Sequence, residues 1–231
     1  MMYDYAGLLQ QISVFALPAI FAITLHEAAH GFVADKLGDD TARRAGRVTF
    51  NPLRHIDPFG TVLMPLLLFF VSRGSFLFGY AKPVPVNFGR LNHPRIDMVW
   101  VALAGPGINI LMAVTAALLF YVVPIVPDVA RLWAEENLVQ AVKFNVLLAV
   151  FNMIPLPPLD GGRVAVGLLP NFLAFPLARL ERYGILIVIG VLFLVPWAGS
   201  HLLGVDLSFV NLIIYWPYNV IVHAIAQLAP A

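Results

Sequence analysis

Two histidines and a glutamate near the amino terminus have the types and the spacing of a metal-dependent hydrolase. His26, Glu27 and His30 form the pattern H-E-x-x-H. Residues four apart on an α-helix share a face, so the two imidazoles can converge on one tetrahedral Zn²⁺ ion. The Glu27 carboxylate would then lie where it can take a proton from a water molecule. The alternative is a pair of buried histidines whose ring nitrogens bond to backbone or hydroxyl groups.

The sequence around this motif favours the metal site over two structural histidines. The motif lies in an apolar run from Ala6 to about Val33. At 1.5 Å per residue, this run is long enough to cross a hydrocarbon core of about 30 Å. Ionisable side chains are costly in lipid and usually serve a function there. We therefore expect His26 and His30 to bind zinc and Glu27 to act as a general base.

The composition predicts an integral membrane protein. Hydrophobic residues make up 60% of the 231 residues and charged residues 12%, against about 45–50% and 25% in soluble domains. The net charge of +1 argues against a nucleic-acid partner, which would need a clustered basic surface. Because the chain has no cysteine, histidines and carboxylates must supply any metal ligands.

The apolar segments predict an all-α polytopic fold with five full transmembrane helices and one re-entrant or short sixth segment at residues 58–80. The five predicted spans are 6–33, 98–123, 139–169, 183–197 and 207–228. Basic side chains follow the first span, so the positive-inside rule predicts an external amino terminus and an active site toward the cytoplasm. These basic residues are Lys36, Arg43, Arg44, Arg47 and Arg54. The acidic stretch around Asp128 and Glu135 is expected to be an outer loop.

Two short segments are expected to be extended and to lie near the cytoplasmic face. Residues 46–53 carry β-branched and aromatic residues between turn formers, which predicts a short β-strand. Residues 81–87 contain two prolines one residue apart, so they cannot be helical. The whole chain, 1–231, is expected to be a single domain with a catalytic core at about 7–170 and accessory spans at about 183–228.

A catalytic zinc site usually has three protein ligands, and Asp160 is the best candidate for the third. The predicted span 139–169 enters from outside, so Asp160 lies toward the inner end, at the depth of His26 and His30. The prolines before Asp160 break the helix, and irregular backbone at membrane depth is tolerated where it is buried in protein or lines a cavity. The alternative is a helix cap, in which the Asp160 carboxylate accepts backbone N–H groups.

Two asparagines in apolar surroundings are further candidates. Asn152 is expected either to donate a hydrogen bond to a developing oxyanion or to bond carbonyls freed near Pro155. Asn109 follows the small residues of Ala104-Gly105-Pro106-Gly107 and is expected to pack against the first span or to orient a ligand. The remaining histidines have no partner at ligand spacing and are expected to be structural: His55, His93, His201 and His223.

These motifs together resemble the site-2 protease family of intramembrane zinc metalloproteases, in its compact bacterial branch without a PDZ or CBS domain. The resemblance covers about residues 7–170. It rests on His26 to His30, Gly46 to Pro52, Pro83 to Asn87, Ala104 to Pro106 with Asn109, and Asn152 to Gly162.

The resemblance implies a multi-pass protease of the bacterial cytoplasmic membrane that hydrolyses peptide bonds within or next to transmembrane helices. It implies one Zn²⁺ per chain held by His26, His30 and Asp160, with Glu27 as the general base and Asn152 as a transition-state stabiliser. The partners would be a substrate helix and the lipid bilayer, and the oligomeric state stays open. We expect the extended segments to hold an unwound substrate by strand addition. Their candidate substrate-binding residues are Val48, Thr49, Pro83, Val84 and Pro85.

Two rival functions stay open at this point. A metal transporter could use the same histidines and aspartate as a transit site, but it would not need Glu27 as a base. A catalytically inactive module could hold membrane helices without cutting them, although it would have little reason to keep the complete set of ligands and Glu27.

Overall fold

The computed structural model describes residues 5–49, 51–55, 57–63, 67, 82–204 and 210–230. Regular structure in these residues is helical, and they contain no β-strand, which confirms the all-α prediction. The α-helices are α1 (Tyr5–Lys36), α2 (Thr41–Arg44), α4 (Pro94–Leu119), α5 (Asp128–Asn152), α6 (Asp160–Leu168), α7 (Asn171–Arg179), α8 (Gly184–Ile189), α9 (Val195–Ala198) and α10 (Trp216–Ala226). Short 3₁₀ and π turns are η1 (Pro52–Arg54), η2 (Pro58–Leu63), η3 (Phe88–Arg90), η4 (Phe120–Ile125), η5 (Leu180–Tyr183), η6 (Gly190–Leu194), η7 (Gly199–Leu203) and η8 (Asn211–Tyr215).

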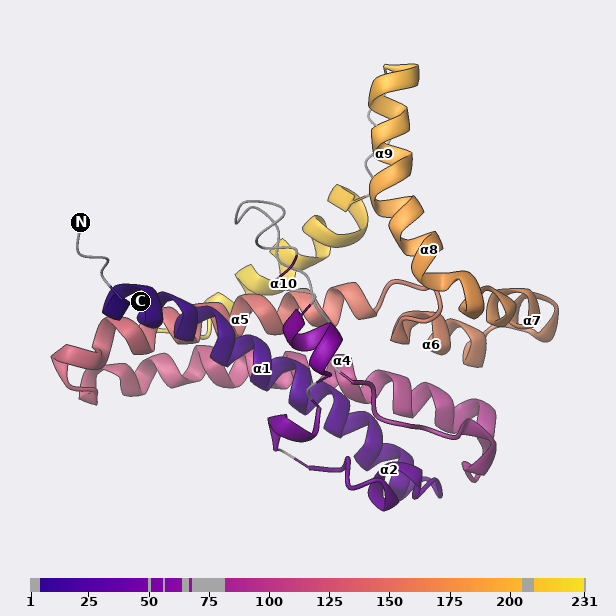
Figure 1. Cartoon of the computed structure of the whole chain (residues 1–231), viewed down its shortest axis with the longest axis horizontal. Helices are drawn as coiled ribbons and strands as arrows, with labels where there is room; N and C mark the ends of the chain where they lie inside the picture. The colour runs from indigo at the N-terminus through magenta and orange to yellow at the C-terminus, as the bar shows by residue number, and fades with distance from the viewer. Residues whose placement is uncertain are drawn as a thin grey trace.

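Three long helices, α1, α4 and α5, pack against one another and form the body of the molecule (Figure 1). Pro94 starts α4 at a position where proline loses no helical hydrogen bond. Helix α5 begins directly after Pro127, with the favourable charge of Asp128 in its first turn. The stretch around Asp128 and Glu135, predicted to be a loop, is therefore helical and forms the first turns of α5. Its predicted outer position stays a prediction.

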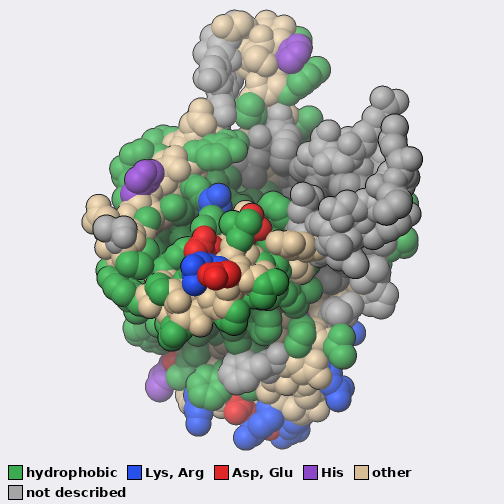
Figure 2. Space-filling view, turned by 90° about the vertical axis from the view of Figure 1, so that its left-hand side faces the viewer, with side chains coloured by type: hydrophobic (Ala, Val, Ile, Leu, Met, Phe, Trp, Pro, Cys, Tyr) green, Lys and Arg blue, Asp and Glu red, His purple; other side chains and the backbone are tan. Residues whose placement is uncertain are grey.

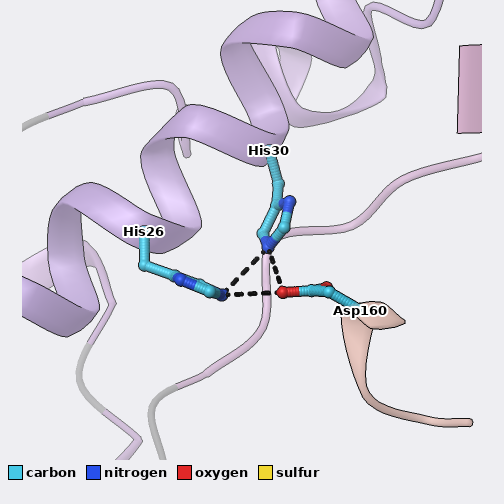
Figure 3. Close-up of side chains that lie close together, drawn as sticks. All are labelled: His26, His30 and Asp160. Carbon is cyan, nitrogen blue, oxygen red and sulfur yellow. Dashed lines mark hydrogen bonds and ion pairs between the residues drawn. The ribbon is translucent and has the colours of Figure 1, made fainter. Parts of the chain in front are cut away.

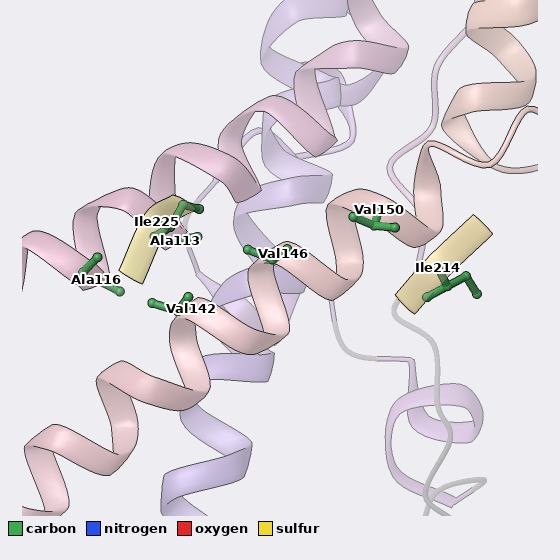
Figure 4. Packing of buried hydrophobic residues seen from close by; sticks show 8 residues of the cluster. Ala113, Ala116, Val142, Val146, Val150, Ile214 and Ile225 are labelled. Carbon is green, nitrogen blue, oxygen red and sulfur yellow. The ribbon is translucent and has the colours of Figure 1, made fainter. Parts of the chain in front are cut away.

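Small side chains allow the long helices to approach closely. Val142, Val146 and Val150 lie four residues apart on one face of α5 and pack against Ala113 and Ala116 of α4 (Figure 4). Ile214 and Ile225 from the C-terminal helices complete the cluster. This packing fixes α4 relative to α5 and so positions every side chain that α4 presents to α1.

Many large apolar side chains lie on the outer surface of the helices. Phe15, Phe32, Trp100 and Leu111 are each more than half exposed. Figure 2 shows a largely hydrophobic face, with Lys and Arg side chains gathered at the lower end, where Figure 1 places α2. Two stretches of the described chain, Ile12–Lys36 and Pro94–Ile125, are long and apolar enough to cross a membrane. These features are those of a membrane protein.

The five predicted spans are not all present as membrane-length apolar helices in the described residues. The first turns of α5 carry charged residues, and α6 has only nine residues. The predicted spans near the carboxyl terminus are divided into short α and π segments. Most of the predicted re-entrant hairpin at 58–80 lies outside the described residues, and its first part is the π turn η2.

The predicted β-strand at 46–53 is wrong for the residues that are described. Gly46 has φ of 64°, which turns the chain away from an extended path. The Asn51 side chain accepts the Leu53 N–H and starts η1, so this part of the chain bonds locally instead of to a neighbouring strand. Residues 82–87 are not helical, as expected, and they belong to no sheet.

The chain between α5 and α6 makes a tight turn that directs Asp160 toward α1. Gly161 and Gly162 lie directly on the backbone of this turn, and a Cβ atom at either position would overlap backbone atoms of Met153 or Pro157. The two glycines therefore let the start of α6 pack onto the turn, and α6 also packs against α4.

Candidate metal centre

Helix α1 and the first residue of α6 bring three ligand atoms together. His26 and His30 extend from one face of α1 toward Asp160 (Figure 3). The His26 and His30 Nε2 atoms lie 3.0 Å apart, and they lie 3.2 and 3.4 Å from Asp160 Oδ2. All three residues are buried, and among the described residues they form the one group of three or more such side chains that could hold a metal ion.

Hydrogen bonds at the far side of each imidazole fix its tautomer. His26 Nδ1 lies 2.6 Å from the Asn109 Oδ1 atom, and His30 Nδ1 lies 2.7 Å from the Val101 carbonyl oxygen. Both oxygens only accept hydrogen bonds, so both Nδ1 atoms must donate. In the neutral form, each ring therefore presents a lone pair at Nε2, which is the form that binds a metal.

The three converging atoms fit a zinc ion. Two imidazole lone pairs and a carboxylate oxygen repel one another at these distances unless a cation lies between them. Asp160 Oδ2 is buried and has no hydrogen-bond donor. Ligand bonds of about 2.0–2.1 Å in tetrahedral geometry place neighbouring ligand atoms about 3.3–3.4 Å apart, close to the observed separations.

The Asp160 side chain does not cap α6. Leu159 is the N-cap residue of this helix, and no side-chain hydrogen bond caps it. Asp160 is instead the first helical residue, and its carboxylate is turned toward the two histidines. This geometry removes the alternative of a pure helix cap.

Glu27 lies beside the three ligands in a cavity of about 300 Å³. Its Oε2 atom accepts a hydrogen bond of 2.7 Å from the Val84 backbone N–H. The cavity is lined by His26, Glu27, His30, Pro83, Val84, Val86, Phe88, Val101, Ala102, Asn152, Pro158, Asp160 and Arg163. A second cavity, of about 610 Å³, lies between α4, α5 and the C-terminal helices, but its lining is apolar and offers no group for chemistry.

The other residues singled out in the sequence are placed in different ways. Asn152 lines the cavity, and its side-chain N–H donates to the Leu148 carbonyl, so one of its two amide protons is used within α5. Pro83 and Val84 also line the cavity, whereas Pro85, Val48 and Thr49 are not among its lining residues. His93, His201 and His223 are exposed. His55 is buried, with its Nε2 atom 3.1 Å from the Thr49 carbonyl oxygen.

Asn109 joins α4 to both neighbouring long helices. Its Oδ1 atom accepts from His26, while its Nδ2 atom donates to the Ala22 carbonyl and to Asn145 Oδ1. Asn109 and Asn145 are both fully buried. The sequence analysis left two roles open for Asn109, packing against the first span or orienting a ligand. The Asn109 amide makes both kinds of contact, because it bonds to the backbone of α1 and to the His26 ring.

Replacing Asn109 by alanine is expected to weaken zinc binding about 10- to 100-fold, the range that follows loss of a group supporting a ligand. Zinc titration of purified protein measures this. The matched control is Asn145→Ala, because Asn145 is equally buried and belongs to the same hydrogen-bond chain but does not contact His26. Equal losses of zinc affinity in both variants would show that general packing, and not the bond to His26, is responsible.

The sequence analysis did not single out Asn145, Arg163 or Val101. Asn145 and Arg163 carried a signal in the sequence, and Val101 did not. Asn145 is a buried amide in an apolar stretch, the same signal that singled out Asn109. Arg163 lies one turn after Asp160, on the same helix face. Val101 acts through its backbone carbonyl, which no side-chain pattern reveals.

A buried carboxylate, Asp39, closes the turn that follows α1. It accepts hydrogen bonds from the Thr41 backbone N–H and hydroxyl and from the Asn87 backbone N–H. Burial alone would raise the pKa of Asp39, but these hydrogen bonds and the nearby charge of Arg90 together lower it below its usual value.

The lowered pKa of Asp39 predicts a loss of stability in acid. The unfolded chain, with an Asp pKa of about 3.9, takes up the proton first, so the stabilisation is complete above that value and is lost as pH falls through the lower folded pKa. We expect the free energy of unfolding to decrease less between pH 5 and pH 3 in Asp39→Asn than in the wild type. Denaturant titration in detergent across this range tests the prediction, and identical pH dependence in both proteins would contradict it.

The helical membrane fold and the buried His-His-Asp group define a membrane protein with the ligand set of a zinc hydrolase. Sequence comparison gives the family. The chain is 37% identical over 188 residues to "Putative zinc metalloprotease YwhC" of Bacillus subtilis, covering 80% of this chain and 81% of that protein. It is 30% identical over 179 residues to "Putative zinc metalloprotease Rip2" of Mycolicibacterium smegmatis, covering 77% of this chain and 65% of that one.

A third relative, the Rip2 protein of Mycobacterium tuberculosis H37Rv, is 28% identical over 204 residues and carries the same description. No family model matches the chain, and no solved structure matches it significantly. The chain belongs to the site-2 protease-like family of zinc metalloproteases.

Proposed function

We propose that this protein is an intramembrane metalloprotease that hydrolyses peptide bonds within or next to transmembrane helices. The observation that carries the proposal is the convergence of three possible ligand atoms beside the Glu27 carboxylate, in a cavity bounded by a membrane-length helix. The relatives support the metalloprotease part of it. The apolar surface supports action on substrates that share the membrane.

In this proposal His26, His30 and Asp160 hold one zinc ion. Bound zinc would supply Lewis acidity, which lowers the pKa of water and polarises a carbonyl group. Asn109 and Val101 keep the imidazole rings turned so that both Nε2 atoms face the ion.

Glu27 acts as the general base. Its carboxylate accepts a proton from the attacking water and returns it to the nitrogen of the leaving amine, so the peptide bond is exchanged for a carboxylate and an amine. The Val84 N–H restrains one carboxylate oxygen and leaves the other to take the proton. Asn152 keeps one amide N–H that can donate to the carbonyl oxygen of the substrate as charge develops there.

The proposal extends to the arrangement in the membrane. The chain acts as a single multi-pass domain whose amino terminus is outside and whose active site faces the cytoplasm, in keeping with the basic side chains around α2. The substrate is a transmembrane helix that unwinds before it is cut, because an intact helix hides its carbonyls in hydrogen bonds. Pro83 and Val84 are the two proposed substrate-binding residues that line the cavity.

The position of Glu27 and the names of the relatives favour a protease over the metal transporter or inactive helix-binding module that the sequence left open. The test uses detergent-purified protein and synthetic transmembrane peptides that carry Gly, Pro or Asn near one end of the helix. We expect cleavage that a zinc chelator stops and that added zinc restores. Failure to cleave any peptide in the panel, in a preparation with one zinc ion per chain, would contradict the proposal.

A further inference from the structure

Residues 82–87 form a non-helical segment beside the cavity that contains Glu27, and hydrogen bonds hold it at three points. The Lys82 N–H donates to the His55 carbonyl at 2.9 Å, and the Val84 N–H donates to Glu27 at 2.7 Å. The Asn87 N–H donates to Asp39 Oδ2 at 2.6 Å. Pro83 and Pro85 have no N–H to donate, so these three contacts use three of the four amide donors in the segment.

The segment runs along the last turns of α1. A Cβ atom at Gly31 would lie 3.0 Å from the Val84 side chain, so Val84 packs directly on this helix. Val86 and Phe88 pack against the cluster of Ala34, Leu91 and Val101. Glu27 therefore holds the segment near one end, and Asp39, just beyond the end of α1, holds it at the other.

The Asp39 side chain is placed by the local fold to hold the end of the segment. Its side chain is fully buried, and Gly38, with φ of 108°, turns the chain so that Asp39 lies under the segment. One carboxylate oxygen is held by Thr41, which leaves the other to bond the Asn87 N–H. A buried ionised carboxylate is costly unless such hydrogen bonds satisfy it. Losing Asp39 would release the segment at this end.

We infer that Asp39 is a positioning residue for the catalytic base: by anchoring residues 82–87, it sets where the Val84 N–H meets the Glu27 carboxylate. The inference rests on the proposed function. Asp39 does not line the cavity that contains Glu27 and does not contact the three candidate ligands, so it acts on Glu27 only through the segment. Its loss should therefore lower turnover without removing zinc.

The test compares the wild type with Asp39→Asn and with the matched control Asp35→Asn. Asp35 is a carboxylate near the end of α1 that pairs with Arg43 and makes no hydrogen bond or ion pair with residues 82–87. We expect kcat to fall about 10- to 100-fold in Asp39→Asn, which is the loss that follows when a hydrogen bond supporting a functional group is removed or a catalytic group is slightly misplaced. We expect the zinc content to be retained. We expect Asp35→Asn to keep wild-type kcat.

Amide hydrogen exchange of a peptide covering residues 82–87 gives a readout that does not depend on activity. The prolines contribute no signal, so the peptide reports the four amides of Lys82, Val84, Val86 and Asn87. Faster exchange there in Asp39→Asn, with wild-type exchange in α4 and α5, would support positioning. Unchanged exchange of these amides and unchanged kcat in Asp39→Asn would contradict the inference that Asp39 positions the catalytic base.

A second variant covers the case in which Asp39→Asn fails to fold. Thr41→Val removes the hydroxyl donor to Asp39 but keeps the carboxylate and its bond to Asn87, so a smaller change in the same direction is expected. Wild-type exchange and kcat in Thr41→Val would then count against the inference. Absence of cleavage by the wild type would instead contradict the proposed function, while the exchange measurement still decides whether Asp39 anchors the segment.

Discussion

Replacing Glu27 by glutamine is expected to lower the rate of peptide cleavage by about 10²- to 10⁴-fold, the contribution typical of a general base. Glutamine has nearly the same size, and its amide oxygen can still accept the Val84 N–H, so the local structure should be kept. It cannot accept the proton of the attacking water. Glu27 is not one of the three converging ligands, so the zinc content should stay at the wild-type value.

The measurement is cleavage of one transmembrane peptide by both proteins, with zinc assayed in the same samples. Glu135→Gln is the control, because Glu135 lies in the first turns of α5 and does not line the catalytic cavity. Cleavage by Glu27→Gln at the wild-type rate would exclude Glu27 as the base. This result would also make the alternative function, a metal transporter that uses these residues as a transit site, a candidate again.

Replacing Gly105 by alanine is expected to have the second large effect, a fall in zinc affinity of about 100-fold, at the upper end of the losses caused by disturbing the support of a ligand. A Cβ atom at Gly105 would lie 2.5 Å from His26 Cε1 and 2.5 Å from His30 Nε2. Neither ring can move aside without breaking its Nδ1 hydrogen bond to Asn109 or Val101. The added methyl group should therefore turn the ligand atoms out of position.

Gly107→Ala is a matched control two residues away on the same helix. A Cβ atom at Gly107 would have no neighbour within 4 Å, so the same substitution adds the same methyl group in open space. We expect Gly107→Ala to bind zinc as the wild type does, as measured by competition with a fluorescent chelator. Equal zinc affinity in Gly105→Ala and Gly107→Ala would contradict the prediction, because it would mean that a methyl group at position 105 does not displace the His26 and His30 rings.

The convergence of His26, His30 and Asp160, the predicted zinc ligands, could be foreseen in part from the sequence. The spacing of His26 and His30 fixes their common face on α1. The predicted span 139–169 is not continuous, and Asp160 reaches the histidines through the turn between α5 and α6. The helical fold follows from the long apolar segments. The structure brings the three side chains together within hydrogen-bonding distance, as this reasoning expected.

The predictions that were wrong depended on neighbours that a local pattern does not reveal. Residues 46–53 have the composition of a strand, but a strand needs a partner, and Gly46 and Asn51 form turns instead. The polar residues after Pro127 look like a loop, yet they form the first turns of α5, in which Asp128 and Glu136 are exposed. The roles of Gly105 and Asp39 depend on contacts between segments far apart in the chain.

The most direct test of the central claim is the zinc content of the purified wild type beside a variant in which His26, His30 and Asp160 are all replaced by alanine. Both proteins are also incubated with the same transmembrane peptide. We expect about one zinc ion per chain and cleavage for the wild type, and neither for the variant. Equal zinc binding by both proteins, or cleavage by the variant, would contradict it.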